Sequence, residues 1–346
     1  MNTSLRRACR WMLLLLTPAA CAPLLCNTLP LLASGSAALS PAWQATTAWD
    51  VAALALLIIG WMLHARCRMR AVMTVALLAC VLAILAPAHN VLALDGAHVL
   101  LRAPIAFSPR SIDSNAGPLA SCSAVHPLGT DHIGRDVAAR LLHGLRDSVG
   151  LALAAATCAL LLGAFAGVAA AVARGWLDMV LTLAAQALSA FPVLLVVLLL
   201  QGMALPSIGW LLLLLVLFRV AGVYRLMRGE TARLLGRPWM AAARADGLSL
   251  WMLLRRELLP HLLAPMAVNF AFGVAAVILV ESSLSFLGFG VPAPLPSLGE
   301  MLQQGRALLP QWTRLLLLPC VLITGVTALT LHTGTLLRRA AAEERS

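Results

Sequence analysis

Long apolar runs, separated by short polar or charged segments, recur along the whole chain. A helix needs about 20 apolar residues to cross the hydrocarbon core of a membrane. Eight runs approach this length, approximately at residues 11–33, 46–64, 71–93, 149–172, 178–202, 209–226, 265–287 and 314–337. The pattern predicts an all-α integral membrane protein with about eight transmembrane helices, three before residue 94 and five after residue 148.

The composition supports membrane insertion and excludes several functions. Of the 346 residues, 61% are hydrophobic and 11% are charged, which is more apolar surface than a soluble domain can bury. The net charge of +11 comes from arginines scattered at the ends of apolar runs, not from a basic stripe of the kind that binds nucleic acid. The chain contains no lysine, so it lacks a lysine-bearing phosphate loop, and we expect any ATP and Mg²⁺ to be bound by partner subunits.

The distribution of arginine predicts the orientation of the spans. Arginine gathers on the cytoplasmic side of membrane proteins, and most of the arginines fall on that side if both termini are cytoplasmic. The first run, which follows Arg6, Arg7 and Arg10, also resembles a cleaved signal peptide. Its apolar character continues to Leu32, which favours a retained span.

The segment 95–148 is expected to lie on the outer side, between the third and fourth spans. Apolar residues recur at four-residue spacing from Ile133 to Leu145, a pattern typical of an amphipathic helix on the membrane surface. Thr130 or Asp131 is expected to cap this helix. The predicted domains are a membrane extension of about three spans at 1–94, the loop and amphipathic helix at 95–148, and a core domain at 149–340 that includes a cytoplasmic connection at 227–263.

The cytoplasmic connection carries signals for two short helices. Pro238 is expected to begin the first, and Gly247 allows the φ > 0 turn that ends it. Ser249 is expected to cap the second, which we expect to end at Pro260. The two helices carry apolar side chains (Trp239, Met240, Trp251 and Met252) and cationic ones (Arg244, Arg255 and Arg256). Such a knob fits a groove on a partner and can transmit rigid-body motion.

This connection resembles the EAA loop in the membrane subunits of binding-protein-dependent ABC importers. Ala242, Ala243, Gly247 and the Leu259-Pro260 pair stand at the family's spacing, whereas Ala241 stands where the family usually has glutamate. The resemblance implies that the helix before Gly247 is a coupling helix that sits in a cleft of the ATPase. The implied coupling residues are Ala241, Ala242, Ala243, Arg244, Asp246, Gly247, Leu259 and Pro260.

Two further stretches resemble motifs of the second permease in dipeptide, oligopeptide and nickel importers. They are His126-Pro-Leu-Gly-Thr-Asp-His-Ile-Gly-Arg-Asp136 and Glu281-Ser-Ser-Leu-Ser-Phe-Leu-Gly-Phe-Gly-Val-Pro292, the latter followed by Pro296-Ser-Leu-Gly299. The resemblance covers residues 126 to 340 and implies a type I ABC importer transmembrane domain with a five-helix core. The implied periplasmic motif residues are His126, Gly129, Asp131, Gly134, Arg135 and Asp136.

By this resemblance the chain is expected to be a permease of the bacterial inner membrane and not an enzyme. It would carry di- or oligopeptides and work with a second permease, two ABC ATPases and an extracytoplasmic binding protein. Nickel or a metal chelate is the alternative cargo. An ion-coupled secondary transporter, which would place several charged residues at mid-membrane, and an intramembrane enzyme, which would need a clustered nucleophile or metal set, fit the sequence poorly.

Several residues are left with two readings. His126, Asp131, His132 and Asp136 are able to bind metal, but we favour helix capping and loop packing for them and expect no metal site. Glu281, with Ser282 and Ser285, is either a packing anchor or part of the translocation path. Asp178 and Arg219 are expected near span ends, and Pro192 and Pro319 are expected to kink their helices.

Overall fold

The computed structural model describes residues 107–203, 207–292, 295–309 and 311–343, together with three short strands nearer the N-terminus. The predicted spans at 46–64 and 71–93 lie outside the described residues, as does the first predicted span up to residue 31. The signal-peptide alternative concerns the same undescribed segment.

The three strands form a small antiparallel sheet in the order β2-β1-β3. They are β1 (Leu32–Gly35), β2 (Ala38–Pro41) and β3 (His98–Leu101). The register between β1 and β3 shifts between Leu32 and Ala33. These two residues were predicted to end the first transmembrane span, so the prediction is wrong at that end, where their backbone groups pair with a strand.

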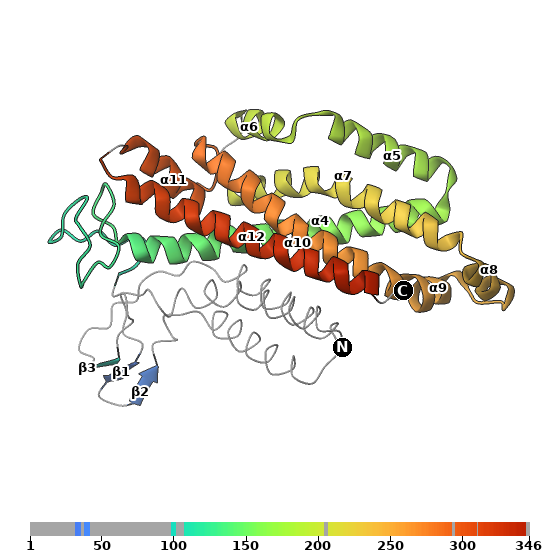
Figure 1. Ribbon diagram of the computed structural model, residues 1–346, viewed down its shortest axis with the longest axis horizontal. Coiled ribbons are helices and arrows are strands. Elements are labelled where there is room, and N and C mark those ends of the chain that lie inside the picture. The colour runs from blue at the N-terminus through green and yellow to red at the C-terminus, as the bar shows by residue number, and fades with distance from the viewer. Residues whose placement is uncertain are drawn as a thin grey trace. The chain divides into compact units, whose positions relative to one another are not determined.

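All other described elements are helical, which confirms the predicted fold class (Figure 1). They are α4 (Val137–Ala173), α5 (Gly175–Ala190), α6 (Val193–Met203), α7 (Ile208–Leu235), α8 (Pro238–Ala245), α9 (Leu250–Leu253), a π-helical turn (Leu254–Leu258), α10 (Leu259–Phe286), α11 (Leu298–Ala307) and α12 (Thr313–Glu343).

The described helices agree with the predicted core of five spans. Four are long and apolar enough to cross a membrane by themselves, namely α4, α7, the continuous helix Leu250–Phe286, and α12. The pair α5 and α6 passes the same test only together and makes the fifth span if it crosses as one. The predicted span at 178–202 is therefore two helices, which meet at an angle of 83°.

The bend between α5 and α6 follows from Pro192. Phe191 ends α5 with an extended backbone at φ −95° and ψ 140°. Proline clashes with a helical residue before it and pushes that residue into the extended region. The kink predicted at Pro192 is thus confirmed. Pro319, in contrast, lies inside α12, which continues past it to Glu343.

The amphipathic segment before the fourth span is not a separate surface helix. Its helical part forms the first turns of α4, which runs on to Ala173. At 1.5 Å per residue a 37-residue helix is about 55 Å long, well over the roughly 30 Å of hydrocarbon core. Val137 and Leu141 are buried in the protein, and Ile133 precedes the helix and is 40% exposed. The apolar side chains of this segment therefore pack on protein within the first turns of α4.

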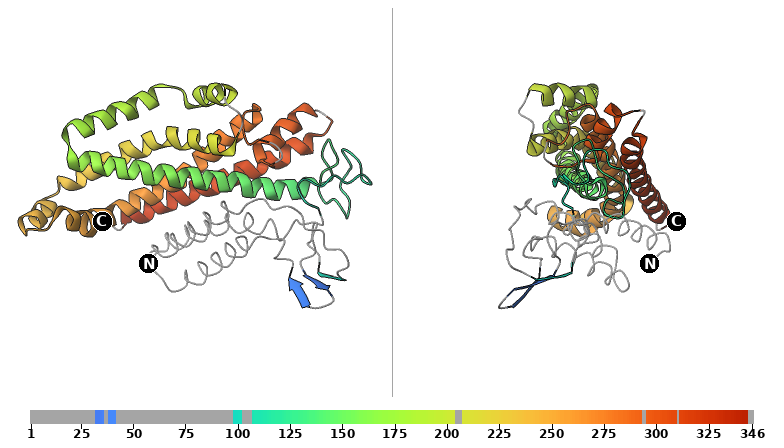
Figure 2. Two further views of the ribbon diagram at one scale, coloured as in Figure 1. Left: turned by 180° about the vertical axis from the view of Figure 1, so that it is seen from behind. Right: turned by 90° about the vertical axis from the view of Figure 1, so that its left-hand side faces the viewer.

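Residue contacts divide the described chain into two units, and each is considered by itself. One comprises residues 107–154 and 278–329, and the other residues 155–277 and 330–343. In the second unit α5 packs against α7, as the views in Figures 1 and 2 show. Ala170, Ala185, Ala221 and Tyr224 form a small buried cluster there.

Glycines allow close helix packing in both units. In the second, a Cβ on Gly167 of α4 would lie 2.7 Å from the carbonyl oxygen of Tyr224 on α7, so these two backbones approach as in other membrane helix pairs with small residues. In the first, a Cβ on Gly305 of α11 would lie 2.7 Å from the backbone of Leu315 on α12. Any larger residue at either position would separate the two helices.

Candidate functional site

The connection between α7 and α10 begins as two short helices joined at a glycine. Gly236 ends α7, and Pro238 begins α8, where a missing N–H costs nothing. Gly247 follows with φ 76°, which glycine adopts without strain. The hydroxyl of Ser249 accepts a hydrogen bond from the backbone N–H of Met252 at 3.4 Å and caps α9. The predicted helix start, glycine turn and serine cap are confirmed.

Pro260 does not end the second helix, contrary to the prediction. α9 passes through the π-helical turn directly into α10. In that turn the N–H of Leu259 donates to the carbonyl oxygen of Leu254, five residues back. The wider turn accommodates the proline ring, which in a regular helix clashes with the carbonyl four residues before it.

The outer surface of the connection is apolar and cationic. Trp251 is 71% exposed and Leu250 is 56% exposed. Arg255 and Arg256 are exposed on the same connection, and Arg244 lies on it as well. This surface is therefore suited to a partner that offers an apolar groove with an acidic rim.

Two side chains hold α8 in place from within. Met240, which was predicted on the outer surface, is instead fully buried. Trp239 stacks on His261 of α10, with ring centroids 4.9 Å apart. Most of the other residues of α8 are exposed.

The implied coupling residues lie together on this connection. These residues differ in exposure. The exposed members include Ala241, Ala242, Arg244, Asp246 and Leu259, whereas Ala243 and Pro260 are partly buried. Ala241 presents a methyl group at the surface position where a glutamate was expected, so it supplies no charge for a salt bridge. The N–H of Asp246 donates to the carbonyl oxygen of Ala242 at 3.0 Å and closes the last turn of α8.

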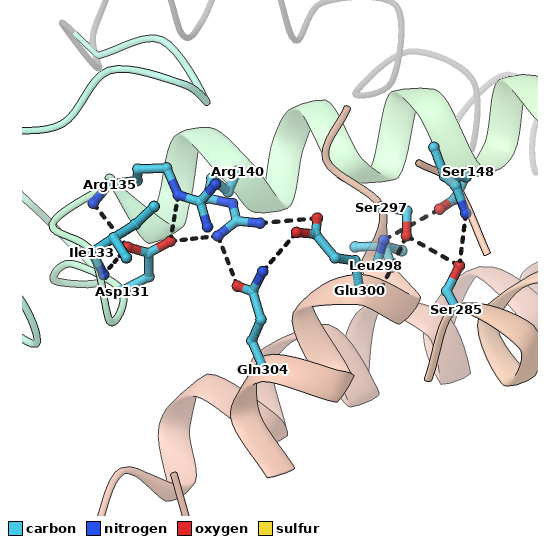
Figure 3. A network of polar contacts seen from close by, with 11 residues as sticks. Asp131, Ile133, Arg135, Arg140, Ser148, Ser285, Ser297, Leu298, Glu300 and Gln304 are labelled. Atoms are coloured by element: carbon cyan, nitrogen blue, oxygen red, sulfur yellow. Dashed lines mark hydrogen bonds and ion pairs between the residues drawn. The ribbon is translucent and has the colours of Figure 1, made fainter. Parts of the chain in front are cut away.

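Glu281 lies in a buried cluster of serines. Its side chain is 0% exposed, and Oε1 accepts a hydrogen bond from the hydroxyl of Ser285 at 2.7 Å. Ser285 also lies 3.4 Å from the hydroxyl of Ser297 (Figure 3). The hydroxyl of Ser148 on α4 accepts a hydrogen bond from the N–H of Leu298 at 3.3 Å. The cluster thereby joins α4, α10 and the start of α11, which favours the packing reading for Glu281.

Glycine packs tightly beside this cluster. A Cβ on Gly299 would lie 2.8 Å from the carbonyl oxygen of Ser282. Within the described residues, Oε2 of Glu281 and the hydroxyl of Ser282 have no hydrogen-bond partner. The motif residues predicted from 281 to 299 are therefore brought together, although their buried polar atoms are incompletely paired.

Asp131 organises the loop before α4. Its Oδ1 accepts hydrogen bonds from the N–H groups of Ile133 at 3.0 Å and Arg135 at 2.9 Å (Figure 3). Its Oδ2 accepts from Nε of Arg135 at 2.7 Å and from the guanidinium of Arg140. Burial opposes ionisation, but these amides and the two arginines hold the pKa of Asp131 below its usual range. The helix cap belongs to Asp136, which accepts from the N–H of Ala139 at 2.7 Å, and not to Thr130 or Asp131 as predicted.

Arg140 extends this network to α11. It is 1% exposed, although it lies off the four-residue apolar spacing that runs from Ile133 to Leu145. Nη1 donates to Oε1 of Gln304 at 2.8 Å, and Nη2 donates to Oε2 of Glu300 at 3.0 Å (Figure 3). These partners lie about 160 residues further along the chain, so no local spacing pointed to them.

His126 lies between two carboxylates. Nδ1 is 2.7 Å from Oδ2 of Asp136, and Nε2 is 3.1 Å from Oδ2 of Asp113. Both ring nitrogens face acceptors, which suits the protonated imidazolium. Burial alone lowers the pKa of His126, but its hydrogen bonds to Asp136 and Asp113 outweigh burial and raise that pKa. Of the residues predicted to be able to bind metal, His126, Asp131 and Asp136 thus contact protein groups. The described residues contain no cluster of three or more His, Cys, Asp or Glu arranged for a metal ion.

The stability of this loop is expected to fall as the pH rises. A raised pKa in the folded state means that protonated His126 stabilises the fold below the unfolded pKa of about 6.5. That contribution is lost as the pH rises through the higher folded pKa. The N–H of Leu119 donates to the backbone oxygen of Asp131 at 2.8 Å. Hydrogen exchange at this N–H measures the stability of the loop once the intrinsic exchange rate at each pH is corrected for. Protection should fall over this window in the wild type and stay constant in His126→Gln, and equal pH profiles would contradict the assignment.

Asp178 lies in the first turn of α5, near the span end where it was predicted. Arg228 of α7 binds Asp178 of α5 with both arms of its guanidinium, and Nη2 is 2.6 Å from Oδ2. The hydroxyl groups of Thr182 and Tyr224 lie 2.9 Å apart beside this pair. Arg219 lies within α7 six positions before Arg225, and α7 continues past the predicted span end at residue 226 to Leu235.

Comparison with known proteins places these features in a family. Residues 159–339 match the family model described as binding-protein-dependent transport system inner membrane component. The peptidoglycan transport system permease protein YejE of Agrobacterium fabrum is 35% identical over 192 residues, which are 56% of this chain and 50% of that protein. The dipeptide transport system permease protein DppC of Alkalihalophilus pseudofirmus is 31% identical over 62% of this chain and 72% of that protein.

A third relative, the glutathione transport system permease protein GsiD of Pectobacterium atrosepticum, is 30% identical over 56% of this chain and 63% of that protein. The matched segment thus spans about half the length of the Agrobacterium relative. The family match contains the α7–α10 connection, the part of the serine cluster around Glu281 that lies on α10 and α11, and most of α12.

Proposed function

We propose that this chain, which belongs to the family of binding-protein-dependent transport system inner membrane components, is the permease subunit of an ATP-driven peptide importer. The protein is a multi-pass protein of the inner membrane. Its proposed partners are a second permease of the same kind, two cytoplasmic ABC ATPases that bind ATP and Mg²⁺, and an extracytoplasmic binding protein. The scatter of arginines supports cytoplasmic N- and C-termini.

The observation that carries the proposal is the exposed knob formed by α8 and α9. A protein surface rarely leaves a tryptophan as exposed as Trp251 without a partner, and here leucine and arginine side chains accompany it on the same connection. An ATPase with an apolar groove and acidic rim would cover this surface. The connection would then serve as the coupling element between ATP hydrolysis and the membrane spans.

The continuity of α9 with α10 supports this coupling role. A hinge between two helices would absorb a displacement, whereas a continuous helix passes it along its axis. Because Leu250–Phe286 runs without a break, a pull on α9 reaches the membrane-spanning part of α10. The stack of Trp239 on His261 would make α8 move with the same helix.

Peptides are the proposed cargo. Two of the similar proteins are named for dipeptide and glutathione transport, and glutathione is itself a peptide. Peptides share a backbone with amide donors and acceptors and a terminal carboxylate. The proposal extends to this chain the substrate class that these relatives' names share.

Purification of the protein with its natural partners tests the knob as the ATPase contact. Trp251→Ala should weaken binding of the ATPase to this chain by about 30-fold and so lower the amount that co-purifies, because a central exposed tryptophan in an interface contributes about 2 kcal/mol or more. The amount of the second permease should stay the same.

Trp176→Ala is the matched control. Trp176 is 76% exposed but lies in the apolar helix α5, where lipid would cover it. This variant should retain the ATPases at the wild-type level. Equal retention of ATPase by both variants would show that the knob is not part of the ATPase contact. If neither ATPases nor a second permease co-purify with the wild type, the proposed function is overturned.

A further inference from the structure

Arg219 lies in the apolar part of α7, between Ile208 and the charged residue Arg225. It follows the first residue of the helix, Ile208, by eleven positions, which is about 16 Å along the axis. The next charged residue, Arg225, follows by six positions, or about 9 Å. A charged side chain at such a depth marks a functional site by default.

The guanidinium of Arg219 is held on one side and open on the other. Nη2 donates to the backbone oxygen of Asn269 at 3.2 Å and lies 3.3 Å from its Oδ1. Within the described part of the chain these are its hydrogen bonds, so Nε and Nη1 have no protein acceptor there. The side chain is only partly buried, which leaves these N–H groups accessible.

Glycine makes the space for this group. A Cβ on Gly273 of α10 would lie 3.0 Å from Nη2 and 3.2 Å from Nε of Arg219, tighter than ordinary packing. On α7 itself, Gly222 would place a Cβ 3.7 Å from Nη1. The guanidinium therefore lies against bare backbone on both helices, fixed in position by Asn269.

Two other arginines on the helices have carboxylate partners. Arg228 binds Asp178, and Arg140 binds Asp131 and Glu300. Arg219 has an amide where these have a carboxylate, although a guanidinium removed from water needs an anion most. No carboxylate pairs with Arg219 within the described part of the chain, so an anion that binds it would come from outside that part.

We propose that Arg219 binds a carboxylate group during transport, and that the carboxylate is the C-terminus of the translocating peptide. The N–H groups of Nε and Nη1, which have no acceptor in the described part of the chain, can each donate to a carboxylate oxygen, and every linear peptide carries a carboxylate at its end. A carboxylate side chain of the second permease offers the same chemistry and is the other source. Lipid phosphates lie outside the hydrocarbon core, too far from a side chain pinned at this depth. The inference rests on the proposed peptide-import function.

Uptake of paired peptides into vesicles containing the complete transporter tests this inference. The probes are alanyl-alanine and its C-terminal amide, which differ in the carboxylate. Arg219→Gln should lower the ratio of kcat/KM for the acid to kcat/KM for the amide by about tenfold, the usual loss on removing one side of a charge-assisted pair. Selectivity of the binding protein is the same in both transporters and cancels from the comparison. Arg225→Gln removes the same charge from an exposed position on the same helix and should leave the ratio unchanged.

The outcomes separate the two sources. A lower ratio in Arg219→Gln alone assigns the carboxylate to the peptide. Equal losses for both peptides, together with loss of the second permease on purification, assign it to that subunit instead and overturn the peptide as source. Equal losses with the complex intact, or no loss, overturn the carboxylate site. If the wild type imports neither peptide with ATP, the proposed function fails and this inference fails with it.

Discussion

Replacing Gly247 with isoleucine is expected to lower transport at least about tenfold while membrane insertion stays at the wild-type level. The backbone there has φ 76°, which costs a β-branched residue about 1–3 kcal/mol. A Cβ added at this position would have no other atom within 4 Å, so the cost is conformational and not a clash. We expect the turn to relieve this conformational cost by a rotation of α8 relative to α9. Each loss of about 1.4 kcal/mol in the binding energy of the ATPase contact weakens that contact about tenfold.

Gly247→Asn is the matched variant. Asparagine adopts this left-handed conformation far more readily than branched residues, so uptake should stay within about twofold of the wild type. Peptide uptake by reconstituted vesicles, with the inserted protein quantified, measures both variants. Wild-type uptake in the isoleucine variant would show that the glycine turn has no part in coupling.

Removing the guanidinium of Arg140 is expected to destabilise the first unit strongly. Arg140→Ala leaves the buried carboxylate of Asp131 and the carboxylate of Glu300 without their shared cation. Breaking a buried ion pair by deleting one partner costs about 3–5 kcal/mol. Loss of protection from hydrogen exchange in residues 107–136 and a lower midpoint of thermal unfolding in detergent would report the change.

Arg135→Ala separates this effect from a general loss of charge. The side chain of Arg135 is 16% exposed and forms an ion pair with the same aspartate, Asp131, but this pair stays within the loop and does not reach α11. Its removal should cost less than that of Arg140, because Asp131 keeps the guanidinium of Arg140 and its backbone N–H donors. If the two alanine variants unfold at the same temperature, the link from Arg140 to α11 contributes nothing to stability.

Local rules predicted the parts of the structure that depend on adjacent residues. The start of α8 at Pro238, the turn at Gly247 and the cap at Ser249 each need information from a few positions, as does the kink at Pro192. The five apolar runs after residue 148 were likewise long enough to read as spans because lipid imposes their length.

The failures have several causes. Arg140 lies off the predicted apolar spacing, yet it is buried because its partners on α11 lie about 160 residues away. Met240 was expected outside because a short helix has no clear apolar face, yet it is buried. Pro260 was expected to end a helix, but a π-helical turn lets the chain pass. The helix α7 continues to Leu235, beyond the residue 226 at which the hydropathy pattern ended the span, and this continuation carries charged residues from Arg225 to Arg233.

The central claim, that ATP hydrolysis by partner subunits drives peptide import through this permease, is tested most directly by uptake into sealed vesicles. The vesicles contain this chain with its co-purified partners, ATP inside and binding protein with labelled dipeptide outside. We expect accumulation that requires hydrolysable ATP and persists when proton and sodium gradients are abolished. Accumulation that follows an ion gradient and continues without ATP would contradict the account and identify an ion-coupled transporter.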